Sequence, residues 1–154
     1  MKSNKFALAA ILLWVATVAV FAWFFVRGST VAGSDNRTAV VLGASERDLV
    51  LSEMRGMLSA TQGILEGINR GDMKQVAQSS RVAGMGAAAD VNPALMAKLP
   101  LPFKQLGMSV HHEMDELAVA AESGKPAAEL QQMLVSALSK CVACHAAWQI
   151  KSGS

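Results

Sequence analysis

A run of 21 residues between Phe6 and Val26 limits what this chain can fold into more than any other feature of its sequence. Thr17 is the one polar residue in the run, which also holds two of the three Trp and four of the five Phe of the chain. At a rise of about 1.5 Å per residue, a helix of this length spans roughly 31 Å, close to the hydrocarbon thickness of a bilayer. The run is therefore predicted to be a transmembrane helix.

A cleaved secretory signal is the alternative interpretation of this run. The apolar part of such a signal usually covers about 7–15 residues before a small-x-small cleavage site. Thr30-Val31-Ala32 resembles such a site, but the run is longer than a signal needs and has aromatic residues near its exit, which favours an uncleaved anchor. Because Lys2 and Lys5 precede the run, we expect a single-pass protein of the bacterial cytoplasmic membrane whose remaining chain lies in the periplasm.

The rest of the chain divides into two further parts. Residues 28–43, rich in Gly, Ser, Asp and Asn, are predicted to be a flexible tether between the anchor (residues 1–27) and a folded domain (residues 44–154). Without Lys2, Lys5 and Arg27, the 14 basic residues fall to 11 against 12 acidic ones, a formal charge of −1. This balance predicts no nucleic-acid partner.

Four segments of the folded domain carry apolar residues at helical spacing. The first is expected to begin at the capping pair Ser45 and Asp48 and to end near Gly71, and Asp72 is expected to cap the second. A short helical turn at Asn92-Pro93 precedes the third segment, which carries Phe103. The fourth begins at Pro126 and is predicted to keep Trp148 on its apolar stripe.

The predicted fold class follows from what these segments lack. No segment alternates between apolar and polar residues with period two, and the connections are short. We therefore predict an all-α fold, an antiparallel four-helix bundle preceded by one N-terminal transmembrane helix. Beyond the anchor, Phe103 and Trp148 are the only aromatic residues, so a flat cofactor is one candidate for supplying the large planar surface that this core lacks.

The chain's two cysteines lie in one short motif, Cys141-Val142-Ala143-Cys144-His145. This Cys-x-x-Cys-His pattern is read as c-type haem attachment. In that chemistry the two thiols bind the haem vinyl groups and the adjacent imidazole reaches the iron. On a helix Cys141, Cys144 and His145 share one side, so the sequence predicts one covalently attached haem c with His145 as an iron ligand.

Three other uses of the cysteines were weighed. A redox dithiol opens a helix that follows a strand, whereas this motif lies near the end of a predicted helix. A structural zinc site needs a fourth ligand, and His111 and His112 have no ligand-like spacing. A disulfide between cysteines three residues apart on a continuing helix has poor geometry. Haem attachment is favoured over all three.

The chain resembles the cytochrome c prime family, in which a four-helix bundle carries the attachment motif in its last helix. The resemblance covers roughly Ser45 to Lys151 and includes Trp148, one turn after the motif histidine. Gln149 departs from the family, which often has a basic residue at that place, and so does the membrane anchor. The resemblance implies that the first helix of the bundle supplies the group facing the open side of the iron.

The sixth iron ligand decides the function that the resemblance implies. Met54 and Met57 lie one turn apart on the first helix. We expect Met54 to be the ligand, because the family's distal residue lies about sixteen residues before the end of that helix. Met57 as the ligand, and both methionines as plain core residues, stay open. A methionine ligand favours electron transfer, whereas an apolar residue leaves a five-coordinate iron suited to small gases.

Other polar residues were assigned minor roles. Arg47, Arg55 and Lys104 are candidate partners of the haem propionates. His111 lies on the border of the third helix's apolar face and His112 points away from it. Both are expected at the surface or in support of the site, with His111 left open as an alternative axial ligand.

The predicted function is electron transfer at the periplasmic face of the membrane by a monohaem c-type cytochrome that is not an enzyme. Its partners would be membrane-bound or periplasmic redox proteins, which the tether keeps at high local concentration. Two alternatives stay open: a five-coordinate haem protein that binds or detoxifies nitric oxide or peroxide, and a fixed haem subunit of a larger membrane complex. Homodimer formation is also left open.

Overall fold

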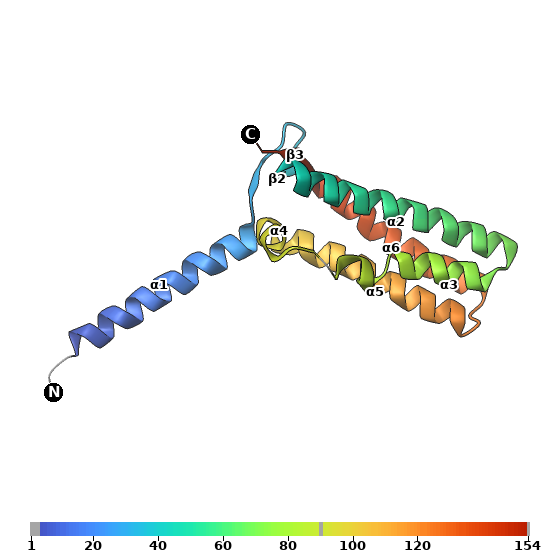
Figure 1. Cartoon of the computed structure of the whole chain (residues 1–154), viewed down its shortest axis with the longest axis horizontal. Helices are drawn as coiled ribbons and strands as arrows, with labels where there is room; N and C mark the ends of the chain where they lie inside the picture. Colours follow the sequence, from blue (N-terminus) through green and yellow to red (C-terminus); the bar gives the residue numbers. More distant parts are fainter. Residues whose placement is uncertain (1–3, 90, 154) are drawn as a thin grey trace.

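The computed structural model describes residues 4–89 and 91–153 and is mostly helical, with six α-helices and a small three-stranded sheet (Figure 1). Four helices lie side by side, and successive ones run in opposite directions (Figure 1). They are α2 (Ala44–Arg70), α3 (Met73–Val82), α5 (Leu101–Glu122) and α6 (Ala127–Ala147). The short η1 (Met85–Ala88) and α4 (Pro93–Lys98) join α3 to α5.

The helix boundaries follow from local capping. The Gly43 N–H donates to Glu46 Oε2 at 2.8 Å, so α2 begins before the predicted Ser45 cap, and that prediction is wrong. The helix ends at Gly71, which adopts a left-handed φ of 68°. The predicted Asp72 cap is confirmed, because its carboxylate accepts from the Gln75 N–H at 3.0 Å.

The start of α4 also matches the sequence. Asn92 Oδ1 accepts from the Ala94 N–H at 2.8 Å, and Pro93 occupies the first turn. Proline fits there because its missing N–H would have no helical partner. The predicted helical turn at Asn92-Pro93 is confirmed.

The sheet corrects two predictions, the purely α-helical fold and the flexible tether. Residues 28–43 contain β1 (Thr30–Ala32) and β2 (Thr38–Leu42), which pair antiparallel, and β2 pairs parallel with β3 (Trp148–Ser152). β2 reads Thr-Ala-Val-Val-Leu, and Val40 and Leu42 are buried in the core. Burying these side chains and pairing the backbone outweighs the flexibility that Gly and Ser suggested.

The end of α6 differs from the prediction for the same reason. Trp148 was expected on the helical stripe, but α6 ends at Ala147 and Trp148 is the first residue of β3, opposite Thr38 in the parallel register. The Trp148 N–H still donates to the Cys144 carbonyl, which closes the last turn of α6. The chain therefore changes from helix to strand just after the Cys-x-x-Cys-His motif.

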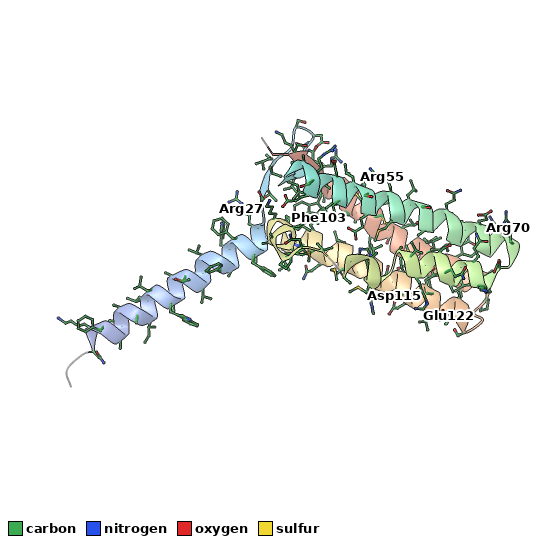
Figure 2. The ribbon with its side chains drawn as sticks, in the orientation of Figure 1. Arg27, Arg55, Arg70, Phe103, Asp115 and Glu122 are labelled. Carbon is green, nitrogen blue, oxygen red and sulfur yellow. The ribbon has the colours of Figure 1, made fainter. Side chains whose placement is uncertain are left out.

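The buried apolar side chains form two clusters along the four helices. The far cluster joins α2, α3, α5 and α6 at the end away from the sheet and includes Ile64, Val76, Leu117, Leu130 and Leu134. The sheet-end cluster joins β2, α2, α4 and α5 and consists of Val40, Leu42, Val50, Leu95, Leu99 and Phe103. Figure 2 shows Phe103 at the end where α1 meets the other helices and Arg70 at the opposite end.

The apolar helix α1 (Lys5–Arg27) projects away from the other helices at the sheet end (Figure 1). It has no buried residue, and among the described residues it is the one helix long and apolar enough to cross a bilayer, as a membrane anchor or as a signal sequence. Lys5 is its first residue, whereas Lys2 lies outside the described residues.

A close joint connects α1 to the folded domain. Gly28 has a φ of 62°, and a Cβ at this position would lie 2.5 Å from the Lys98 carbonyl oxygen. The Ser29 N–H donates to the same carbonyl at 2.7 Å. Lys104 Nζ donates to the Phe25 carbonyl at 3.2 Å and lies 3.7 Å from the centre of the Phe25 ring. The end of α1 is thus fixed to α4 and α5 by direct contacts.

Candidate functional site

The last turns of α6 carry the motif at the boundary between the two clusters. Cys141, Cys144 and His145 have the i, i+3 and i+4 spacing that puts side chains on one side of a helix. Cys141 packs against the far cluster and Cys144 against the sheet-end cluster. The motif therefore contacts both clusters.

Two hollows lie beside the motif. One of about 110 Å³ is bounded by both cysteines and His145, and one of about 160 Å³ is bounded by Cys144 and His145. Met54 of α2 and Phe103 of α5 border both hollows. Met54 and Phe103 therefore lie at the shared border of the two hollows.

The two methionines of α2 differ in their positions. Met54 borders both hollows next to His145 and packs against the same cluster as Cys144. Met57 borders only the smaller of the two and packs against the far cluster. Both are partly buried. Met54 therefore borders both hollows that His145 lines, whereas Met57 borders one of them.

A glycine leaves additional room on the α5 side of the 110 Å³ hollow. Gly107 lies within α5 and borders the 110 Å³ hollow, and a Cβ built on it would meet no atom within 4 Å. Glycine inside a helix costs about 1 kcal/mol relative to alanine. Val50, Leu106 and Val110 add apolar side chains to the lining of this hollow.

The chemical state of the thiols argues against a redox dithiol. Both cysteines are free and partly buried. Burial raises the pKa of the Cys141 thiol, and the nearby Glu113 carboxylate raises it further. Burial also raises the pKa of Cys144, and Cys141 adds to this effect. Thiols that stay protonated at neutral pH are poor nucleophiles for disulfide exchange.

The zinc interpretation also lacks geometric support. Across residues 4–89 and 91–153, no three His, Cys, Asp or Glu side chains come together in an arrangement that could hold a metal ion. A structural zinc site uses four such ligands at about 2.0–2.3 Å. Cys141, Cys144 and His145 without further ligands do not meet this requirement.

The two aromatic residues beyond α1 meet next to the motif. The rings of Phe103 and Trp148 are 6.1 Å apart at 85°, an edge-to-face pair. Such pairs contribute about 0.5–1.5 kcal/mol beyond their buried area. Both residues also border the 160 Å³ hollow, so the large planar side chains of the folded domain are concentrated at one wall of the site.

The cations near the hollows are not the three that the sequence suggested. Arg47 pairs with the adjacent Asp48 at 3.4 Å, and Arg55 lies exposed on the outer side of α2 (Figure 2). Lys104 is buried against Phe25, and burial lowers its pKa. None of the three borders the two hollows beside the motif, whereas Lys140 borders one and Arg37 the other.

Sequence reasoning missed Arg37. Its Nη1 lies 3.3 Å from the His145 carbonyl oxygen and 3.5 Å from that of Trp148. Arg37 and His145 are 108 residues apart in the sequence, and the segment around Arg37 was expected to be flexible. The contact forms because β2 pairs with β3, and no local sequence pattern predicts that pairing.

The two adjacent histidines of α5 have different surroundings. His112 is exposed, as expected, and lies 3.3 Å from Glu116. His111 is buried, which corrects the prediction of a border position. Its Nδ1 lies 2.8 Å from the Ala83 carbonyl oxygen and its Nε2 lies 3.0 Å from Glu53 Oε1. Because both ring nitrogens have partners, His111 has no nitrogen free to be an axial ligand.

The charge of His111 follows from these partners. Burial lowers its pKa, but the Glu53 hydrogen bond, the Ala83 carbonyl and the Glu53 charge raise it, and the net pKa lies above the ordinary value. Glu53 precedes Met54 on α2 and borders the 110 Å³ hollow. The contact between buried His111 and partly buried Glu53 therefore links α5 to α2 beside the site.

Comparison with protein-family models, with curated proteins and with solved structures finds no match for this chain. The interpretation of the site therefore rests on its residues and geometry.

Proposed function

We propose that this protein is a membrane-anchored monohaem c-type cytochrome that transfers electrons between redox proteins at the periplasmic face of the cytoplasmic membrane. One observation carries the proposal: Cys141, Cys144 and His145 border the same hollow as Met54 on the opposite helix. The proposal places the chain with the cytochrome c prime family and interprets α2, α3, α5 and α6 as the antiparallel four-helix bundle of that family.

Each motif residue has a defined task in this proposal. Cys141 and Cys144 would hold the haem, each thiol adding its S–H across one vinyl group so that two C–S bonds form without an oxidant. The His145 imidazole would bind the iron. Haem bound in this way supplies a one-electron iron couple. The raised thiol pKa values are compatible with structural cysteines that end as thioethers.

The side chains opposite the motif set the second axial position and the polarity of the site. Met54 borders both hollows next to His145 and is the proposed sixth ligand. A thioether ligand favours reduced iron and raises the reduction potential, as electron carriers require. Phe103, Leu106 and Val110 give the 110 Å³ hollow a largely apolar lining, and a nearby charge acts more strongly in apolar surroundings than in water.

A five-coordinate protein that binds nitric oxide or peroxide is the second candidate, and one observation favours it. A hollow of about 300 Å³ shares Glu53, Met57 and His111 with the hollow beside the motif. Small molecules would reach the α2 side of the site through it. An absorption spectrum of the reduced protein with and without carbon monoxide separates the candidates, because a low-spin spectrum that ignores the gas supports the carrier.

Covalent attachment is tested with the full-length protein produced alongside a c-type cytochrome maturation system. We expect haem staining after denaturing electrophoresis to persist through acid acetone extraction, because thioether bonds survive that treatment. Cys141→Ala together with Cys144→Ala abolishes the stain, whereas Val142→Ala, between the cysteines and exposed, keeps it. A wild-type band that loses all haem in acid acetone overturns the proposal.

Membrane attachment is tested separately. We propose that α1 stays uncleaved and spans the membrane, because its residues between Lys5 and Arg27 are apolar except Thr17 and none of the helix is buried in the folded chain. The protein is then expected to remain in the membrane fraction after a carbonate wash. Soluble protein whose amino end begins near Gly33 would identify α1 as a cleaved signal instead.

A further inference from the structure

The carbonyl groups at the end of α6 need partners, and one of them belongs to the motif histidine. The last four carbonyls of a helix have no partner within the helix, and together they carry a partial negative charge. Trp148 N–H closes on the Cys144 carbonyl. The next carbonyl, that of His145, lies 3.3 Å from Arg37 Nη1. A guanidinium here satisfies the carbonyl and complements the helix dipole.

Arg37 is itself held in place by a second charged group. Its Nε donates to Asp35 Oδ2 at 2.8 Å, and its Nη2 lies 2.6 Å from the same oxygen. The other carboxylate oxygen, Asp35 Oδ1, accepts from Gln149 Nε2 at 3.0 Å. The pKa of Asp35 is lowered by its hydrogen bond to Arg37, so the pair stays charged at neutral pH.

These contacts connect the loop between β1 and β2 to both sides of the α6–β3 junction. Arg37 contacts the last helical turn and the first strand residue, and Asp35 contacts the second strand residue, Gln149. Arg37 also borders the 160 Å³ hollow together with Met54, Cys144 and His145.

We propose that Arg37 is a positioning residue for His145. Its guanidinium fixes the end of α6 through the His145 and Trp148 carbonyls and thereby limits the rotation of the His145 imidazole about the helix. The inference rests on the proposed function, because it matters only where His145 binds iron. The loop between β1 and β2 would thus help to orient His145, which lies on α6.

The chain offers a matched control in Arg81. Arg81 forms an equivalent two-bond pair with Glu122, at 3.0 and 2.6 Å, that joins α3 to α5. Glu122 lies toward the far end of the helices (Figure 2). Arg81 borders none of the hollows beside the motif. Arg81→Ala therefore removes a comparable exposed ion pair without touching the proposed site.

The test compares wild type, Arg37→Ala, Arg37→Lys and Arg81→Ala as full-length, haem-loaded proteins in detergent. The first measurement is amide hydrogen exchange of residues 144–148. The second is the iron–histidine stretching band in the resonance Raman spectrum of the ferrous protein, recorded in a Met54→Ala background so that the sixth position is open. We expect Arg37→Ala to exchange about tenfold faster at these amides and to shift and broaden the band.

Arg37→Lys keeps the charge and one donor nitrogen, so it should restore part of both signals. Arg81→Ala should change neither signal. An unchanged band in Arg37→Ala overturns the inference, even where the helix end exchanges faster, because Arg37 would then cap the helix without positioning the imidazole. A wild-type protein without covalent haem contradicts the proposed function itself. The haem stain therefore distinguishes the two failures before any variant is compared.

Discussion

The two ends of the four-helix region are built differently although both include residues of α2 and α5. At the far end, Ile64 of α2, Leu117 of α5 and Leu130 of α6 have no exposed surface and belong to one apolar cluster. At the sheet end, the core includes Phe103 and is bordered by the hollows next to the motif. At the far end the apolar core is accompanied by ion pairs such as Arg81–Glu122, whereas the sheet end combines apolar contacts with the hydrogen bond between His111 and Glu53, a helix-to-strand junction and the α1 joint.

This difference indicates a division of labour along the helices. Close packing makes the far end intolerant of volume changes, and each fully buried Leu side chain contributes about 1.5–3 kcal/mol. The sheet end has more space and is held by contacts that come from distant segments of the chain. The proposed site lies at the end that has room for a bound group, and the far end holds α2 and α6 at the separation this requires.

The largest effect is expected from a leucine truncation at the far end. Leu117→Ala should lower the free energy of unfolding by about 3–5 kcal/mol, because the surrounding side chains cannot close the cavity. Leu95→Ala at the sheet end removes the same atoms beside a hollow of about 80 Å³ and should cost about 1 kcal/mol less. Chemical unfolding followed by circular dichroism measures both. An equal or greater cost at Leu95 contradicts the comparison.

The joint to α1 gives the next largest effect. Gly28→Ala forces a side chain into a left-handed φ and into the Lys98 carbonyl, and should cost about 2–3 kcal/mol or detach the end of α1. Gly124→Ala is the matched control: its φ is +76°, but its Cβ would meet nothing within 4 Å. It should cost about 1 kcal/mol. Spin-label distances between α1 and α5 measure detachment. Equal changes in Gly28→Ala and Gly124→Ala would show that the close contacts at Gly28 do not hold α1 in place.

The methionines of α2 test the sheet end directly. Met54→Ala should cost about 1–2 kcal/mol, because the side chain is only partly buried. It should also convert a low-spin ferric spectrum toward high spin and lower the reduction potential, because the thioether ligand is lost. Met57→Ala has a similar cost in stability and should leave the spectrum unchanged.

A spectral change in Met57→Ala instead would show that Met57, one turn after Met54 on α2, is the iron ligand. A wild-type protein that is already high-spin would favour the gas-binding candidate. Absorption spectra and a redox titration of the three proteins distinguish these results.

The smallest effect is a pH dependence at the sheet end. The folded-state pKa of His111 lies above its ordinary value of about 6.5. Its contribution to stability is therefore fully present below about pH 6.5 and is lost as the pH rises through the folded-state pKa. Unfolding measured across this range should show the decline in wild type and not in His111→Gln. His112→Gln, at an exposed position, should keep the wild-type decline; a decline that persists without His111 contradicts the assignment.

The helices could be predicted from the sequence because their signals are local. The spacing of apolar residues is repeated over several turns, and Gly71, Asp72 and Asn92 act on neighbouring backbone groups. The positions of Cys141, Cys144 and His145 on one side of α6 also follow from spacing alone. None of these inferences requires knowledge of which segments meet in space.

The sheet, Arg37 and His111 could not be predicted in this way. β2 is short and mostly apolar without alternation, and its parallel partner β3 follows it by about a hundred residues. Arg37 and Asp35 look like ordinary loop residues until β3 is placed beside β2. His111 becomes buried only when Glu53 and the Ala83 carbonyl approach from two other helices. In each case the deciding contact joins segments that no local pattern connects.

The joint at Gly28 determines how a protein of this kind would meet its partners. With α1 in the bilayer, as proposed, contacts from Phe25 to Lys104 and from Ser29 to Lys98 leave the domain little freedom to swing. Encounters would then depend on lateral diffusion of the whole molecule, a search in two dimensions at one height above the lipid. Electron exchange would be restricted to proteins whose own redox centre reaches that same height.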